Sequence, residues 1–269
     1  MSNNKKKGME GFSALVDRFS KLDVIAEMEK EYQSLASKNL PLSEIDDNSY
    51  IKSVQFTKEV KNSLGESIKE RGIFSPLLVR RKGSHYELIL GRKRYYGAKA
   101  AGLSVVPAII CEISEEEMLL MLLADIRDQR EGNILELAYI DKALVTKFQY
   151  SQQTLAKLTY QSRSQITNTM RLLSLPDPII KEISNGELTY GHARALLGLS
   201  QEEIMALTDT IHKNNLSVRE TELLSKEIKN KETTSTNKNH ILVSSKRVTF
   251  LFETDEERDA FLKKFGFFK

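Results

Sequence analysis

The sequence has little cysteine and no long apolar run. Cys111 is the only cysteine in 269 residues, so no internal disulfide can form, and no Cys/His cluster has the spacing of a metal site. The most apolar run, residues 118–124, is far shorter than the roughly 18 residues that a membrane span needs. Glu10 and Asp17 interrupt the region where a signal peptide would be apolar. We therefore expect a protein of the reducing cytoplasm without a membrane span.

Neither sign of charge predominates in the chain as a whole. Lys and Arg number 40 against 37 Asp and Glu, which gives a formal net charge of +3. The distribution is uneven, because residues 142–181 contain six cations and one acid and the remaining 229 residues sum to −2. A local excess of this kind indicates a surface for a polyanion, which the total does not.

The order of apolar patterns predicts an α+β multidomain chain. A helical stretch at 58–71 is followed by short apolar strands at 76–80, 86–90 and 105–110, with Gly91 opening a helix and Ser114 and Glu117 forming a capping box. Helical patterns then follow one another up to about residue 230. We expect an amino-terminal arm with helical tendency (1–40), a small α/β domain (41–131), an all-α domain (132–230), a polar linker (231–240) and a β-β-α segment (241–269).

The carboxy-terminal segment is too short to bury a stable core alone. It reads as strands at 241–243 and 247–252 and a helix from residue 254. A piece of this size needs a partner surface, so we expect it to find its core in a second copy and to hold a homodimer together.

A helix-turn-helix is predicted inside the all-α domain. Residues 152–158 and 162–171 have its proportions, and Ala156 is small enough for a close helix crossing. Ile166 and Met170 share one side of the second helix, which leaves a polar face with the donors and acceptors that DNA bases and phosphates require. The alternative is a helical hairpin with a solvated basic face, and Tyr160 favours it, because this turn commonly has Gly. The predicted DNA-binding residues are Ser162, Arg163, Ser164, Gln165, Thr167, Asn168 and Arg171.

Two further positions in the sequence suit the binding of a phosphate group. Thr189 is an expected N-cap, which places His192 and Arg194 in the first turns of a helix, although His192 alone is equally compatible with a structural role. Gly91 is followed by three cations at the start of a helix, where backbone amides and the helix dipole favour an anion. A solvated basic turn would have the same composition.

With these residues in place, the sequence resembles the ParB-type partition proteins. The order and spacing of the matching segments carry the resemblance: residues 64–80, 91–107, 129–131, 162–164, 191–197 and 216–222. The resemblance implies a centromere-binding dimer that recognises a palindromic site in double-stranded DNA. It also implies a CTP-binding domain that closes a sliding clamp, and a protein associated with the nucleoid.

The resemblance assigns further residues. Lys5, Lys6 and Lys7 belong to a short basic stretch that is similar to the peptide with which the family stimulates its ParA-type ATPase. The residues that it places at the nucleotide are Arg80, Gly91, Arg92, Lys93, Arg94, Arg127 and Arg130.

Some positions depart from the family pattern. The family has Glu where this chain has Arg92, Gln where it has Ser75, and Glu-Asn where it has Ile126 and Arg127. In the family these positions serve Mg²⁺ and hydrolysis, so acceptors are lost and cations gained, which predicts weak Mg²⁺ binding and leaves CTP hydrolysis undecided. Either Arg92 and Arg127 neutralise triphosphate charge without metal, or the chain has abandoned CTP.

Other functions remain open. A nucleoid-occlusion factor or a plasmid transcription regulator would have the same architecture with another DNA site and partner. An enzyme on a sulfiredoxin-like fold would need a Cys beside the phosphate turn, and Cys111 lies on a strand away from it, which favours an inert core thiol.

Overall fold

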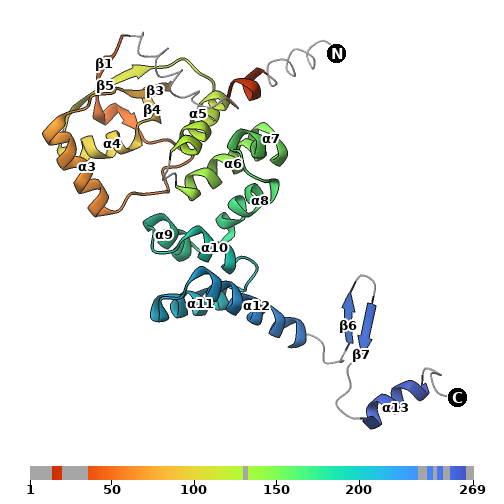
Figure 1. Cartoon of the computed structure of the whole chain (residues 1–269). Coiled ribbons are helices and arrows are strands. Elements are labelled where there is room, and N and C mark those ends of the chain that lie inside the picture. The colour runs from red at the N-terminus through yellow and green to blue at the C-terminus, as the bar shows by residue number, and fades with distance from the viewer. Residues whose placement is uncertain are drawn as a thin grey trace, which may run out of the picture. The chain divides into compact units, whose positions relative to one another are not determined.

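The computed structural model forms two compact units, which meet in the sequence at Leu197 and Gly198 (Figure 1). The structure describes residues 14–19, 36–129, 133–235, 241–244, 247–250 and 255–264. Lys5, Lys6, Lys7 and Arg130 lie outside these ranges, as does the part of the expected linker from residue 236 to 240.

A five-stranded sheet begins the first unit. Its strands are β1 (Lys38–Pro41), β2 (Ile45–Asp46), β3 (Leu77–Lys82), β4 (His85–Leu90) and β5 (Val105–Ile110), in the order β1-β5-β3-β4-β2. The pairs β3–β4 and β1–β5 are antiparallel, whereas β3–β5 and β2–β4 are parallel. The three strands expected from apolar runs are confirmed as β3, β4 and β5, and β1 and β2 were not predicted. A short 3-10 helix, η1 (Leu42–Glu44), joins β1 to β2.

Helices α3 (Lys58–Arg71) and α4 (Arg92–Ala101) pack against each other beside the sheet. The bounds of α3 are those that the sequence predicted. The two helices approach closely at Gly97, where an added Cβ would lie 2.7 Å from Cδ1 of Ile68 and 3.0 Å from the carbonyl oxygen of Leu64.

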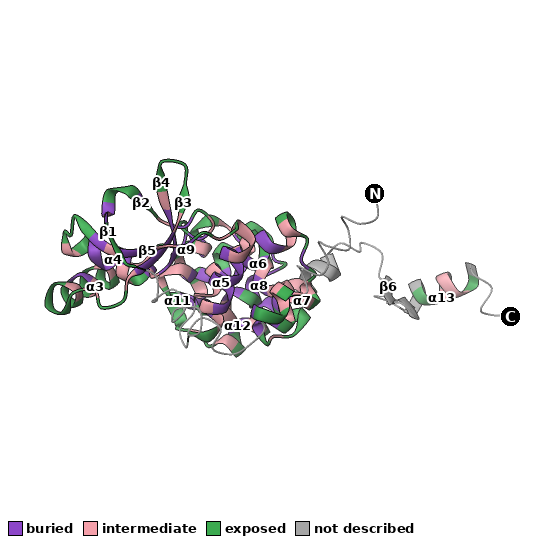
Figure 2. Cartoon of the chain, turned by 90° about the horizontal axis from the view of Figure 1, so that it is seen from above, coloured by how far each residue is buried: buried purple, intermediate pink, exposed green. Residues whose placement is uncertain are grey.

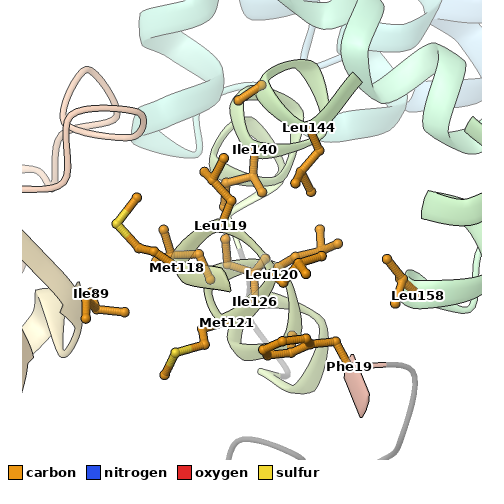
Figure 3. Packing of buried hydrophobic residues seen from close by; sticks show 14 of the residues in the cluster. Phe19, Ile89, Met118, Leu119, Leu120, Met121, Ile126, Ile140, Leu144 and Leu158 are labelled. Carbon is orange, nitrogen blue, oxygen red and sulfur yellow. The ribbon is translucent and has the colours of Figure 1, made fainter. Parts of the chain in front are cut away.

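Helix α5 (Glu115–Asp128) is the centre of the first unit. The capping box of Ser114 and Glu117 is confirmed at its start, and every residue from Met118 to Ala124 is buried. Much of α5 is coloured as buried in Figure 2. Its buried side chains pack against Ile89 of the sheet and against Leu158 of a later helix (Figure 3). A helix that is apolar all round must be covered on all sides, and here the sheet and the helical part share that task.

The helical part of the first unit follows directly. It comprises α6 (Ile134–Phe148), α7 (Gln152–Thr159), α8 (Arg163–Arg171), η2 (Leu172–Ser174), α9 (Asp177–Asn185) and α10 (Tyr190–Leu196). One cluster of buried side chains runs from Ile89 through α5 to Ile166. The hydrophobic core is therefore continuous across the domain boundary that we expected after residue 131. Residues 14–19 of the expected arm are helical, and Phe19 is buried in the same cluster (Figure 3).

The second unit begins with α11 (Gln201–Asn214) and α12 (Val218–Ser235), which contact each other. Helix α12 extends into residues 231–235, which the sequence analysis assigned to the linker. The antiparallel strands β6 (Ile241–Ser244) and β7 (Arg247–Phe250) precede α13 (Asp255–Lys264), so the predicted β-β-α order is confirmed. Of the helices in the described ranges, none is both long enough and apolar enough to span a bilayer.

A buried carboxylate in α6 makes stability depend on pH. The Asp141 side chain is fully buried, and neither of its oxygens has a hydrogen-bond partner among the described residues. Burial disfavours the charged form and raises the pKa of Asp141 from 3.8 to about 8. Between these values the folded state holds a proton that the unfolded state has lost, so the free energy of unfolding falls as pH rises.

We therefore expect Asp141→Asn to remove this dependence. The difference in unfolding free energy between wild type and variant should change in the variant's favour by at most about 1.4 kcal/mol per pH unit between the two pKa values. Urea denaturation of both proteins at several pH values measures it. A constant difference across that range would contradict the assignment.

Candidate functional site

A cavity of about 530 Å³ lies where the sheet, α4, α5 and α6 meet. Its wall includes the end of β4, the turn at Gly91 and the last turns of α5. Glu136, in the first turn of α6, lines the same cavity, so sheet and helical part both contribute to it. The full lining is Ile51, Phe56, Ile89, Leu90, Gly91, Arg92, Lys93, Arg94, Leu122, Asp125, Ile126, Gln129, Asn133 and Glu136.

Gly91 shapes the turn that opens α4. It is the N-cap residue and has φ 104°, a left-handed conformation that favours glycine. A Cβ at this position would lie 2.8 Å from Cδ2 of Leu77, so the site also lacks space for a side chain. The first amides of α4 have no partners within their own helix, and the helix dipole favours an anion beside them.

Arg92 is held inside the protein by two carboxylates. Its guanidinium donates to both oxygens of Asp47, at 2.9 and 2.7 Å, and to the carboxylate of Glu136. It also donates to the carbonyl oxygen of Val54 at 2.9 Å, and the side chain is 7% exposed. Burial raises the pKa of Glu136, and the adjacent Arg92 opposes that rise. Most of the charge that Arg92 brings is thus already compensated, and its role at a triphosphate stays a prediction.

Two aromatic rings flank the same guanidinium. Its central carbon lies 5.4 Å from the ring centroid of Phe56 and 5.5 Å from that of Tyr96. Tyr96 also donates its hydroxyl hydrogen to Asp47 at 2.8 Å. Sequence reasoning missed all of these partners, because no motif marks them and Asp47 lies far from Arg92 along the chain.

The next two cations differ from each other. Arg94 donates to the backbone carbonyls of Ser75 at 2.8 Å and Pro76 at 2.6 Å, which ties α4 to the start of β3. The Lys93 side chain is exposed at the cavity, and no ion pair or hydrogen bond is found for its ammonium within the described part of the chain. Of the three cations after Gly91, Lys93 is therefore the one best placed to meet an added anion.

Arg80 is not among the residues that line this cavity. It donates to Glu87 at 3.0 and 2.6 Å, and Lys82 and Ser49 donate to the other oxygen of that carboxylate. Burial opposes ionisation, but these hydrogen bonds dominate and lower the pKa of Glu87 to about 2. The structure thus gives Arg80 a partner inside the sheet, and its predicted contact with a nucleotide remains untested.

Arg127 contacts the helical part instead of the cavity. It donates to the carbonyl oxygens of Phe19 at 2.9 Å and Leu158 at 3.0 Å, and it pairs with Asp128. Its guanidinium carbon lies 5.1 Å from the ring centroid of Tyr160, and its side chain is 4% exposed. The nucleotide role expected for Arg127 also remains a prediction.

Helices α7 and α8 form the predicted pair. Tyr160 between them has φ 55° and ψ 33°, the left-handed conformation for which the sequence analysis expected Gly. The outward face of α8 carries Arg163 and Arg171, both exposed, and Asn168, which is half-buried. Within the described residues these three side chains make no hydrogen bond or ion pair to the rest of the protein, so they can accept external partners. Ile166 is buried as predicted, and Met170 packs against the same core.

Some of the other predicted DNA contacts have partners within the protein. Gln165 completes a capping box with Ser162, and the Ser162 and Ser164 hydroxyls lie 2.9 Å apart. Thr167 donates to the side chain of Gln152 on α7 at 2.9 Å. Four of the seven residues thus also serve to begin α8 or hold it to α7, and their predicted DNA roles remain untested.

The remaining candidates fall in α10 and after β5. Thr189 is the N-cap of α10, as predicted, and its hydroxyl lies 3.0 Å from Nδ1 of His192. Arg194 is exposed on the same helix. Cys111 is buried, and burial raises the pKa of its thiol to about 11, which suits an unreactive core residue. Among the described residues no group of His, Cys, Asp and Glu could hold a metal ion.

Models of two ParB domains match the chain: the ParB N-terminal domain over residues 26–125 and the ParB HTH domain over residues 130–230. The "Probable chromosome-partitioning protein ParB" of Campylobacter jejuni is 34% identical over 232 residues, which are 86% of this chain and 81% of that protein.

Two crystal structures of C-terminally truncated ParB from Caulobacter crescentus are also similar. The complex with the centromeric parS site is 32% identical and covers 71% of this chain and 100% of its own, with a TM-score of 0.42. The complex with CTP-gamma-S is 33% identical and covers 65% and 98%, with a TM-score of 0.32. On the two domain models and the Campylobacter jejuni relative, the chain belongs to the ParB family of chromosome-partitioning proteins.

Proposed function

We propose that this chain is a partition protein that binds a palindromic DNA site as a homodimer and is gated by a cytidine nucleotide. The observation that carries the proposal is the shared cavity, because Gly91 and Glu136 line it together. A ligand there touches both the sheet and α6, and α6 packs directly on α8. Nucleotide binding can therefore change the position of the DNA-reading helix.

The DNA role is supported by the surface of α8. Arg163 and Arg171 supply charge for phosphates, and Asn168 supplies the paired donor and acceptor that suit a base edge. Arg194, on α10, adds a second candidate for the backbone. The net charge of +5 over residues 142–181 strengthens the attraction to DNA.

The residues beside Gly91 fit a nucleotide phosphate. The N-terminus of α4 offers backbone amides, Lys93 offers an uncompensated charge, and the cavity is of a size found for small-molecule sites. We assign the phosphates of CTP to Gly91, Lys93 and the start of α4. Arg92 keeps its two carboxylates and shapes the wall.

The cavity suits Mg²⁺ less well than it suits a phosphate group. The carboxylates in its lining are Asp125 and Glu136; Glu136 is bonded to Arg92, and Asp125 accepts a hydrogen bond from Gln129 at 2.6 Å. Mg²⁺ prefers free oxygen ligands in an octahedral arrangement, and neighbouring cations weaken its binding. We therefore propose that the nucleotide binds without a strict need for the metal.

The remaining parts of the proposal concern partners. Lys5, Lys6 and Lys7 are assigned to contact with a ParA-type ATPase, and β6, β7 and α13 to the dimer. Such a protein would lie on the nucleoid in the cytoplasm. Genome-wide chromatin immunoprecipitation distinguishes the alternatives, because a few palindromic peaks with broad flanks indicate spreading in partition, whereas narrow peaks at promoters indicate a transcription regulator.

The first DNA prediction compares two residues of α8. Asn168→Ala should reduce discrimination between the specific site and other DNA by roughly 1–3 kcal/mol. Arg171→Ala should weaken all DNA about equally and lower the slope of log affinity against log salt by about 1. Fluorescence anisotropy on specific and scrambled duplexes over a salt series measures both effects. The role assignment is wrong if both variants lose specific and non-specific binding in the same ratio.

The nucleotide prediction concerns Lys93. Lys93→Ala should weaken CTP binding roughly tenfold, the loss expected for one charge-assisted contact. Lys99→Ala is the matched control, because Lys99 is an exposed lysine in the last turn of the same helix and does not line the cavity. Isothermal titration of CTP with Mg²⁺ and with EDTA should give measurable binding in both. Strictly metal-dependent binding, or an equal loss in the two variants, would refute the assignment.

A further inference from the structure

We infer that Arg127 is a positioning residue for DNA binding, which holds the turn between α7 and α8 and ties that turn to the amino-terminal segment at residues 14–19. The inference rests on the proposed DNA-binding function. Arg127 lies at the end of α5, outside the helix pair, and in this inference it controls how rigidly α8 is held for contact with DNA.

The first support is the end of α7. The amide of Tyr160 donates to the carbonyl oxygen of Lys157, and the amide of Gln161 donates to that of Ala156. The next carbonyl along the helix belongs to Leu158. Its carbonyl oxygen accepts from Nη1 of Arg127 at 3.0 Å. The last carbonyls of a helix lack partners in their own helix, and a cation beside them is favoured by the helix dipole. Arg127 therefore caps α7 from outside.

The second support is the turn residue. Tyr160 adopts the left-handed conformation, which disfavours a residue with a Cβ, and it is 56% exposed, so burial alone does not hold it. The guanidinium of Arg127 lies over the Tyr160 ring at 5.1 Å. This contact covers one face of the ring and offsets part of the backbone strain.

The third support is the amino-terminal segment. The same Nη1 atom of Arg127 that donates to Leu158 also donates to the carbonyl oxygen of Phe19 at 2.9 Å. The Phe19 side chain is buried in the cluster that contains Leu158 (Figure 3). We therefore expect a displacement of residue 19 to disturb the guanidinium that caps α7. A protein that binds the amino-terminal residues can in this way alter the DNA-reading pair.

The test uses the full chain and two readouts. Arg127→Ala should accelerate hydrogen exchange at the amides of Tyr160 and Gln161, and it should weaken binding to the DNA site recovered from wild-type immunoprecipitation. The loss should be roughly five- to thirtyfold, which corresponds to the strain of one left-handed residue. Tyr160→Gly removes that strain, so the double variant should recover most of the affinity. If Arg127 only stabilised the fold as a whole, Tyr160→Gly would not restore the DNA affinity of the double variant.

Two further variants complete the design. Phe19→Ala should accelerate exchange at the same amides, because it loosens the amino-terminal segment. Arg81→Ala is the matched control, since Arg81 lies over the Tyr86 ring at 5.5 Å within the sheet, and it should change neither readout. If Arg127→Ala does not fold, Arg127→Gln is measured in its place, because it keeps a planar donor and loses the charge.

The outcomes separate the two proposals. If wild type binds no palindromic DNA, the proposed function fails, and the exchange data alone decide the role of Arg127. If wild type binds but Arg127→Ala binds as tightly, or Tyr160→Gly gives no recovery, the positioning role is overturned. Unchanged exchange in Phe19→Ala would overturn the link to the amino-terminal segment.

Discussion

The burial of α5 on every side is the constraint on which the first unit depends. Its residues from Met118 to Ala124 have no polar face, so stability requires a layer on each side of the helix. The sheet supplies one layer, and α6 and α7 supply the other. The nucleotide-type part and the DNA-type part are thus halves of one core, and a change in the packing of α5 reaches both.

Two buried arginines join those halves around α5. Arg92 links Asp47, beside the sheet, to Glu136 on α6, and Arg127 links α5 to Leu158 on α7. A buried charge needs partners, and removing one partner of such a pair is usually far more destabilising than the pair is stabilising. Both arginines therefore restrict the relative positions of the elements that they join. Hydrogen bonds of the arginines fix the orientation of these elements, whereas the apolar packing of α5 is not directional.

Much of the fold could be predicted, because it depends on local patterns. The apolar periods indicated α3, β3, β4 and β5, and the side chains of Ser114 and Thr189 marked helix starts. Contacts between distant residues have no such signature. Arg92 was predicted at the phosphate site by its neighbours in sequence, but Asp47 and Glu136 approach it only through the tertiary fold. The short strands β1 and β2 were missed because their pairing with β5 and β4, rather than their own composition, defines them.

The chemistry of the cavity follows from one change of charge. Where the family pattern has Glu after the motif glycine, an arginine adds a cation and at the same time engages Glu136, a carboxylate of the cavity wall. The added cation repels Mg²⁺, the engaged Glu136 is one oxygen ligand fewer, and Arg92 itself is not free for phosphate. In the proposed assignment, the charge of the phosphates is neutralised by Lys93 and the first amides of α4, which need no metal to bind an anion. Under the proposed function, the nucleotide would therefore act as a ligand that sets the position of α6, without metal-assisted cleavage.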